Sequence, residues 1–212
     1  MPEFDNELIN ELLDSDYRIA FETGTFEGTR AKLLKDKFEY VYTVEIDKKL
    51  YKMFSTELFK MGIVPILGNS YEIIDSMSGI INSLNYKTLF WLDAHWSGDD
   101  SVDWKNSNWK GFTRPRNTGY IPTNNVVKNS KNQVPLREEI LTIYDKVNNE
   151  CILYIDDFHN IDPITLKGMK NKNFIGENWT CLDFNKIFDI VNDRIIYKKI
   201  TKYQCILKFK SV

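Results

Sequence analysis

The sequence predicts an α/β protein built on a doubly wound, mostly parallel sheet that ends in an antiparallel hairpin. Short apolar runs alternate with runs of helical periodicity along most of the 212 residues, as in parallel strands joined by helical crossovers. The runs FWL and CILYI are apolar without alternation, which is typical of strands covered on both faces. Residues 194–212 lack a helical period and contain consecutive strand-like runs. No helix joins these runs, so we expect a hairpin with one strand antiparallel to the rest.

Each element of this fold is expected from a local pattern. Strands are indicated by short apolar runs, and helices by apolar positions at helical spacing. Pro135 precedes a helical run, as proline often does at a helix start. With 212 residues the chain has room for a substantial core, and we expect a single domain over 1–212. The expected strands are 17–23, 40–47, 63–69, 87–95 and 151–158, and the expected helices are 3–13, 28–38, 48–61, 71–84, 135–147 and 183–192.

Composition argues against several classes of function. The formal net charge of −2 gives no general attraction to nucleic acid or to an anionic membrane surface. No apolar run approaches the ~20 residues of a membrane span. The three cysteines lack CxxC spacing, which argues against a disulfide framework and a zinc knuckle. We therefore expect a cytoplasmic protein without a membrane span, for which nucleic acid is not the expected partner. The sequence does not predict the oligomeric state.

One long segment, residues 96–134, interrupts the alternation of strands and helices. It is polar and rich in Gly, Pro, Asn and Ser, yet it carries several aromatic residues. Long loops in compact domains are usually functional or disordered, and disordered segments seldom hold so many aromatics. We expect a lid that binds the acceptor through Trp96, Arg114 and Arg116, because arginine and tryptophan suit a sugar face, a phosphate or a nucleobase. The alternative is a tolerated surface insertion.

Polar and acidic residues follow nearly every predicted strand. In open parallel sheets, ligands bind beyond the carboxyl ends of the strands, so these side chains should gather at one edge. A purely structural sheet has no need for such a concentration of carboxylates. The residues concerned are Glu22, Gly24, Thr25 and Gly28 after the first strand, Glu45 and Asp47 after the second, Gly68, Asn69 and Ser70 after the third, Asp93 and His95 after the fourth, and Asp156, Asp157 and His159 after the fifth.

The stretch FETGTFEGT, residues 21–29, forms the first strand-to-helix turn. It lacks the lysine of a phosphate-cradling loop and the third glycine of a dinucleotide loop. Glu22 beside the turn would repel a pyrophosphate and suits a cationic cofactor. Glu45 at the next strand end can accept hydrogen bonds from ribose hydroxyls. A solvated carboxylate at a strand end and a turn that uses glycine for its conformation are the structural alternatives.

Together, FETGTFEGT, VYTVEID, ILGNS and LFWLDAH resemble the ordered motifs of class I S-adenosylmethionine (SAM)-dependent methyltransferases. The resemblance covers the chain from about Tyr17 to the end and implies a Rossmann-like, seven-stranded sheet with a terminal antiparallel hairpin. In that family the glycine loop wraps the methionine part, the acidic residue after the second strand holds the ribose, and residues after the third strand flank the adenine. The implied SAM-binding residues are Glu22, Gly24, Thr25, Gly28, Thr29, Glu45, Asn69, Ser70 and Asp93.

A second resemblance indicates which kind of methyltransferase the chain is similar to. LFWLDAH and ILYIDDF together are similar to motifs of the metal-dependent sugar O-methyltransferases related to macrocin O-methyltransferase, and imply a divalent metal, Mg²⁺ or Mn²⁺, held by Asp93, Asp156 and Asp157. The chain departs from that family after Asp93, where it has the sequence AHWSG. LDAHWSG with PLREEI also resembles small methyltransferases encoded near glycan-building enzymes in bacteria and large DNA viruses. For a viral chain, the expected location is the host cytoplasm.

Electrostatics favours a metal independently of the resemblance. Carboxylates at two adjacent strand ends, ~4.8 Å apart, repel one another unless a cation or a proton intervenes. Oxygen ligands suit Mg²⁺ or Mn²⁺. Consecutive strand residues point to opposite faces, so Asp156 and Asp157 both reach the metal only if the strand has ended at Asp156. The alternative is that one is a ligand and the other caps the next helix.

The catalytic base is expected to be Asp93 or His95. Histidine, with an unperturbed pKa of ~6.5, suits proton removal from a hydroxyl, while Asp93 is the base that the resemblance implies. His159 is expected near the metal or the substrate. The predicted function is SAM- and metal-dependent O-methylation of a sugar hydroxyl on a glycan or glycoside.

Other functions are weighed against this one. A methyltransferase acting on nucleic acid or a small phenol is the nearest. A glycosyltransferase is disfavoured, because the only D-x-D sequence is residues 14–16, ahead of the first strand. A non-catalytic binding protein would not need the carboxylates.

Overall fold

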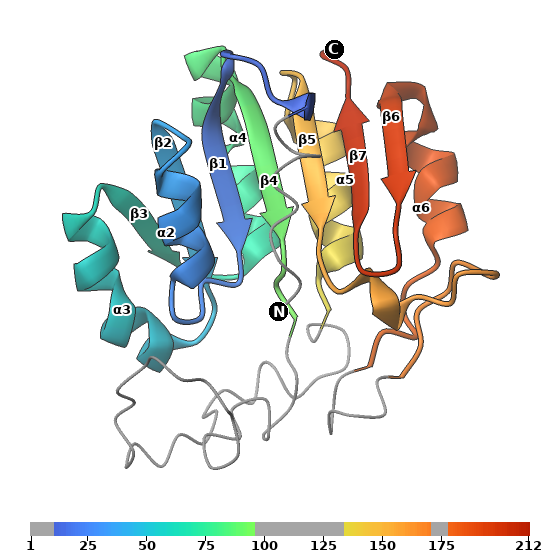
Figure 1. Cartoon of the computed structure of the whole chain (residues 1–212), viewed down its shortest axis with the longest axis horizontal. Helices are drawn as coiled ribbons and strands as arrows, with labels where there is room; N and C mark the ends of the chain where they lie inside the picture. The colour runs from blue at the N-terminus through green and yellow to red at the C-terminus, as the bar shows by residue number, and fades with distance from the viewer. Residues whose placement is uncertain (1–10, 96–133, 171–177) are drawn as a thin grey trace.

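The protein is a seven-stranded sheet with helices on both faces (Figure 1). The computed structural model describes residues 11–95, 134–170 and 178–212. The strand order is β3-β2-β1-β4-β5-β7-β6, and β7 runs antiparallel to both of its neighbours. This confirms the predicted parallel sheet with a C-terminal antiparallel hairpin. The strands are β1 (Tyr17–Thr23), β2 (Tyr40–Glu45), β3 (Ile63–Leu67), β4 (Lys87–Leu92), β5 (Cys151–Ile155), β6 (Ile195–Ile200) and β7 (Cys205–Phe209).

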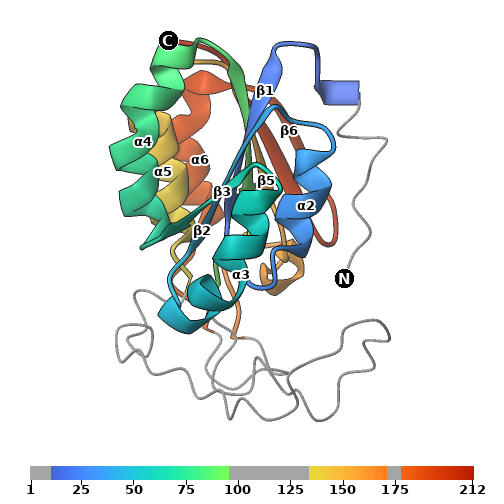
Figure 2. The ribbon, with the colours of Figure 1, turned by 90° about the vertical axis from the view of Figure 1, so that its left-hand side faces the viewer.

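The helices form a layer on each face of the sheet (Figure 2). One layer holds α2 (Thr29–Lys35) and α3 (Lys48–Lys60), and the other holds α4 (Ser70–Leu84), α5 (Leu136–Lys146) and α6 (Phe184–Val191). Short 3-10 turns follow β5 (η1, Phe158–Asn160) and α6 (η2, Asn192–Arg194). The predicted helix 3–13 falls almost wholly outside the described residues. Within the described part of the chain, no helix is both long and apolar enough to cross a membrane.

Alternation along the central strands produces two separate cores. Phe90 in β4 packs in the core beneath α4, α5 and α6, whereas Leu89 and Trp91 face the core beneath α2 and α3. In β5, Leu153 likewise packs in the core beneath α4, α5 and α6, and Ile152 packs in the core beneath α2 and α3. All of these side chains are buried, which matches the unbroken apolar runs seen in the sequence. Any residue that continues a strand without a change in backbone conformation therefore has a predictable face.

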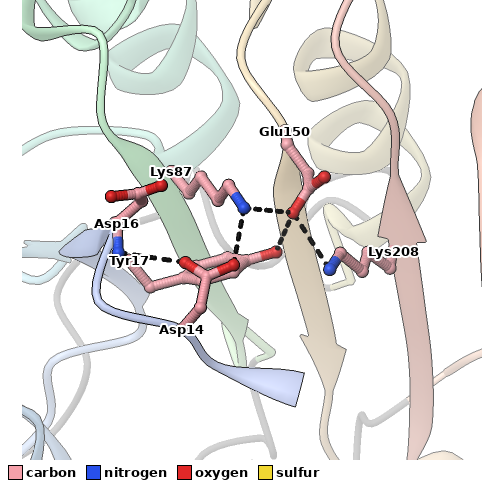
Figure 3. A network of polar contacts seen from close by, with 6 residues as sticks. All are labelled: Asp14, Asp16, Tyr17, Lys87, Glu150 and Lys208. Atoms are coloured by element: carbon pink, nitrogen blue, oxygen red, sulfur yellow. Dashed lines mark hydrogen bonds and ion pairs between the residues drawn. The ribbon is translucent and has the colours of Figure 1, made fainter.

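A polar network ties four strands together at the edge where β1, β4 and β5 begin (Figure 3). The Lys87 ammonium lies 2.6 Å from an Asp14 carboxylate oxygen and 3.1 Å from Glu150. Glu150 also lies 3.0 Å from the Lys208 ammonium and accepts a hydrogen bond of 3.1 Å from the Tyr17 hydroxyl. Burial alone would raise the pKa of Glu150, but Lys208, Lys87 and Tyr17 hold it below its ordinary value.

We expect Glu150→Gln to lower the free energy of unfolding by about 0.5–1.5 kcal/mol at neutral pH, because the carboxylate joins several partners at once. A carboxyl whose folded pKa is lowered contributes stability above its unfolded pKa of ~4.3, and that contribution is lost as pH falls. The variant should therefore approach the wild type below pH ~4. Urea unfolding at several pH values measures this difference.

Asp75→Asn is the matched control. Asp75 pairs with Lys146 at 3.6 Å, and both side chains are more than half exposed. Its effect should stay within about 0.5 kcal/mol, as for ordinary exposed ion pairs. If both variants lost the same free energy of unfolding, the several partners of Glu150 would stabilise the fold no more than an ordinary exposed ion pair does.

Candidate active site

The glycine turn after β1 is shaped by left-handed backbone conformations. Gly24, Phe26 and Gly28 have φ angles of +84°, +47° and +72°. The N–H of Gly24 donates to the carbonyl oxygen of Val44 at 2.9 Å, which ties the turn to the end of β2. A Cβ atom at Gly24 would lie 2.7 Å from the carbonyl oxygen of Asp93. Glycine is therefore needed here both for its φ and because the turn lies against the end of β4.

Glu45, at the end of β2, is fixed by the backbone around it. One carboxylate oxygen accepts a hydrogen bond from the N–H of Phe26 at 2.9 Å, and the other accepts one from Asp47 at 2.8 Å. Only 6% of the residue is exposed, and burial raises its pKa to about 7. Each carboxylate oxygen can accept more than one hydrogen bond, so Glu45 retains capacity for ribose hydroxyls. The ribose-binding role of Glu45 stays a prediction.

Glu22 lies beneath the glycine turn instead of facing outward. It is 1% exposed and accepts a hydrogen bond from the Thr43 hydroxyl, which also bonds the hydroxyl of Thr25. Burial raises the pKa of Glu22 to about 8, while the Thr43 hydrogen bond and the positive charge of Arg30 oppose that shift. In this position Glu22 supports the turn, and direct contact with a cofactor stays a prediction.

The other predicted cofactor residues lie at helix starts. Thr29 is the first residue of α2, directly after Gly28. Asn69 precedes α4 and is half-buried, whereas Ser70 is 5% exposed. The N–H of Gly68 donates to the carbonyl oxygen of Glu45 at 2.9 Å. The turn after β3 and the end of β2 are thus adjacent.

Asp93, His95 and Asp157 come together beyond the ends of β4 and β5. Their potential metal-ligating atoms all lie within 4.8 Å of one another. Nδ1 of His95 lies 3.5 Å from an Asp93 oxygen, and Nε2 lies 3.1 Å from an Asp157 oxygen. His159 borders this trio, with Nδ1 3.6 Å from the other Asp157 oxygen. Two carboxylates and an imidazole form a donor set that suits a divalent transition metal such as Mn²⁺.

Asp156 does not belong to this trio. It continues the alternation of β5, which directs it toward the α2 face. Burial raises the pKa of Asp156, and the positive charge of Arg30 opposes that shift. It is 7% exposed, and its carboxylate accepts a hydrogen bond from the N–H of Asp157 at 3.0 Å. Asp157 has a left-handed φ of +53°, and this change in conformation breaks the alternation. The group of potential ligand atoms within 4.8 Å of one another therefore includes Asp157 and not Asp156, although the Asp156 carboxylate also lies near enough to Asp93 to raise its pKa.

Negative charge accumulates around Asp93. Burial raises its pKa well above the ordinary value, and the nearby Asp156 and Asp157 carboxylates raise it further. Arg30 opposes this shift. Its guanidinium lies over the Trp91 ring, 4.2 Å from the ring centroid, on the opposite face of the sheet from α5. A cation placed among the trio would relieve this repulsion.

Two further residues, Trp179 and Glu139, lie near the trio, and the sequence alone does not single out Glu139 as part of the site. Trp179 is 2% exposed, and its ring centroid lies 5.4 Å from that of His95. Glu139, in the first turn of α5, is 1% exposed and lines a small hollow with Asp93, His95 and Trp179. The sequence does contain a sign of Glu139: it is a charged residue on the otherwise apolar face of its helix, beside Leu136 and Ile140. Trp179 lies in the sequence FIGENWT, from which we expect it either to join the wall of the acceptor site or only to pack.

Several predictions fall on residues that the structure does not describe. Trp96, Arg114 and Arg116 lie outside the described residues, as does nearly all of the predicted 96–134 lid. Val134, the last residue of that segment, is 1% exposed and lines the hollow beside Glu139. The acceptor-binding roles of these residues stay predictions.

Comparisons with known proteins show the fold. No protein-family model matches the chain, and no curated protein matches it. MycE methyltransferase of the mycinamycin biosynthetic pathway, solved with magnesium and S-adenosylhomocysteine (SAH), is similar with a TM-score of 0.50 and 11% identity over 92% of this chain and 45% of that one. A fibrillarin/Nop5p complex has a TM-score of 0.50 and 10% identity over 97% and 79% of the two chains.

An rRNA methylase from Streptococcus thermophilus is also similar, with a TM-score of 0.46 and 13% identity over 97% of this chain and 93% of that one. At such identities a likeness shows fold alone. With the strand order described above, the chain has the Rossmann-like fold that is found in SAM-dependent methyltransferases.

Proposed function

We propose that the protein is a SAM-dependent O-methyltransferase that uses a divalent metal to methylate a sugar hydroxyl. The observation that carries the proposal is the contact between the Gly24 turn and the end of β4. A Cβ at Gly24 would lie 2.7 Å from the Asp93 carbonyl oxygen, so the turn directly borders the Asp93–His95–Asp157 trio. A methyl donor held by the turn would therefore lie next to an acceptor held by the trio.

The assignment of SAM as the cofactor is supported by the order in which the candidate binding residues lie along the edge of the sheet. The Gly24 turn suits the methionine part, the anchored Glu45 suits the ribose, and Asn69 with Ser70 lies where the base would follow. A sulfonium group in the turn would stabilise the ionised forms of Glu22 and Asp93, which burial alone disfavours. MycE, whose fold this chain resembles, was solved with SAH bound.

The metal assignment is supported by the donor set of the trio. Asp93 and Asp157 supply carboxylate oxygens, His95 supplies an imidazole nitrogen, and the like charges around Asp93 favour a cation. A bound divalent cation supplies Lewis-acid polarisation of the acceptor oxygen. MycE was solved with magnesium, and the imidazole in the present trio shifts the preference toward Mn²⁺.

Methyl transfer needs a positioned oxygen and a proton acceptor. The acceptor oxygen forms a bond to the methyl carbon while the carbon–sulfur bond breaks, and the sulfonium becomes a neutral thioether. The hydroxyl proton must pass to a base, for which Asp93 and His95 are the two candidates beside the acceptor. The chain's part is to align oxygen, carbon and sulfur and to hold that base within reach.

We expect the purified protein to transfer a labelled methyl group from SAM to a member of a sugar panel, and EDTA to suppress that transfer. Adding Mn²⁺ or Mg²⁺ back should restore it. Scintillation counting or mass spectrometry of the product measures the transfer. The panel should include simple glycosides, a small catechol and a short RNA, because the acceptor class is the least constrained part of the proposal.

Each outcome bears on a different part of this proposal. Transfer that EDTA does not affect would contradict the metal. Transfer to the catechol or the RNA alone would contradict the sugar acceptor.

A further inference from the structure

Glu139 is a buried carboxyl without a hydrogen-bond partner among the described residues. Both carboxylate oxygens are buried, and neither accepts a hydrogen bond from another described residue. The Ser70 hydroxyl is likewise buried and has no hydrogen-bond partner within the described part of the chain. The hydroxyls of Ser70 and Thr23 lie near enough to lower the pKa of Glu139, but neither meets hydrogen-bond geometry with it. Burial outweighs them and raises the pKa to about 7.

This arrangement is costly for a residue that only packs. A buried polar group without a partner loses its hydration and gains nothing in return. Glu139 occupies the buried stripe of α5, between Leu136 on one turn and Ile140 and Ile143 on the next. An aliphatic side chain at this position would extend the same core at no such cost. The unsatisfied oxygens therefore indicate a partner beyond the described residues, and a bound ligand would supply one.

The hollow beside Glu139 is shared with the candidate active site, because Asp93 and His95 also line it. Ala94, His95, Val134 and Trp179 line it together with Glu139. Its interior holds a group about the size of one water molecule, so a ligand would place only a small polar group there. The walls are mostly apolar, which suits the edge of a flat ring carrying a hydrogen-bond donor.

The position of the hollow suggests which ligand group would reach it. Glu45 is the proposed ribose residue, and the N–H of Gly68 binds its carbonyl oxygen. Ser70 follows this turn directly and lies beside Glu139. A base attached to the ribose would thus extend along the turn after β3 toward Ser70 and Glu139.

We propose that Glu139, with Ser70 beside it, recognises the exocyclic amino group of the cofactor's adenine. This inference rests on the proposed function, and it assigns a base-recognition role that the sequence analysis did not give to α5. A carboxylate oxygen accepts the amino N–H, and its second oxygen faces the ring edge. Glutamine at this position would keep an acceptor oxygen of the same reach, whereas leucine would not.

The test compares two ligands in isothermal titration calorimetry. One is SAH, and the other is its analogue in which hydrogen replaces the adenine amino group. The wild type should prefer SAH by about 10-fold or more, the scale of a buried hydrogen bond to a charged group. Glu139→Leu should reduce that preference to about 2-fold or less, and Glu139→Gln should retain most of it.

Glu45→Ala is the control for general damage to the cofactor site. It should weaken both ligands alike and leave their ratio unchanged. Thermal melts check folding, and Glu139→Leu should melt at or above the wild-type temperature because it removes a buried, unpartnered carboxyl. If that variant does not fold, Glu139→Ala carries the same ratio test, with the same expected loss of preference.

The outcomes separate this inference from the function on which it rests. An unchanged preference in Glu139→Leu, with SAH still bound, would overturn the role of Glu139 and leave the proposed function intact. A wild type that binds both ligands equally would do the same. A wild type that binds neither ligand would overturn the two together.

Discussion

Asp157→Ala is expected to lower metal-dependent methyl transfer by about 100-fold or more, the scale on which a positioned catalytic group contributes. Asp157 is the β5 residue that the left-handed turn brings to Asp93 and His95. Without its carboxylate, the trio loses one of two oxygen donors and would hold a divalent ion weakly. Initial rates over a Mn²⁺ series, with Mn²⁺ binding measured separately by calorimetry, test this expectation.

Asp156→Ala is the matched control, because the two aspartates are adjacent in sequence and differ in the face they occupy. Asp156 is directed toward the α2 side and the charge of Arg30, outside the trio. Its removal should affect stability and leave the apparent affinity for Mn²⁺ within about 10-fold of the wild type. If Asp156→Ala abolished metal binding while Asp157→Ala spared it, the assignment of ligands would be wrong.

Gly24→Ala is expected to destabilise the protein by about 1–3 kcal/mol and to abolish measurable SAH binding. The added methyl group meets a left-handed φ of +84° and the Asp93 carbonyl oxygen at 2.7 Å. The turn must move away from β4 to relieve this contact, and the proposed methionine site and the metal trio would then separate. Urea unfolding measures the stability, and calorimetry with SAH measures the binding.

Gly79→Ala controls for the general effect of replacing glycine. Gly79 lies within α4, and a Cβ there meets no atom within 4 Å. Alanine in an exposed helix interior should stabilise the protein by about 0.5–1 kcal/mol and leave SAH binding unchanged. If Gly24→Ala were as stable as Gly79→Ala and bound SAH equally well, the predicted clash at the turn would be contradicted.

Most of the fold could be predicted because local pattern and burial agree. The first strand was expected over 17–23 and is found at Tyr17–Thr23, and the terminal residues form the predicted hairpin. Strands covered on both faces have unbroken apolar runs, and the structure buries every residue of β5. The edge strand β6 is mostly exposed, and its place in the sheet came from its pairing with β7, not from apolar content.

The candidate site was less predictable, because its geometry depends on single backbone conformations and on contacts between distant elements. Sequence alone could state that Asp156 and Asp157 both reach Asp93 only if the strand ends at Asp156, but it could not predict the left-handed φ of Asp157 that breaks the alternation. Sequence alone also could not show that the Thr43 hydroxyl, from the neighbouring strand, donates a hydrogen bond to Glu22 beneath the turn. Trp179 reaches His95 from a loop far along the chain, and no sequence spacing connects them.

The central claim is that the edge bordered by Gly24 and Glu45 binds SAM. Calorimetric titration of the purified full chain with SAH tests it most directly, because product binding requires neither the acceptor nor the metal. We expect saturable binding of one SAH per chain and a loss of about 10-fold or more in affinity for Glu45→Ala, which removes the proposed ribose acceptor. Absence of SAH binding to the folded wild type, or equal affinity in the Glu45→Ala variant, would contradict the account.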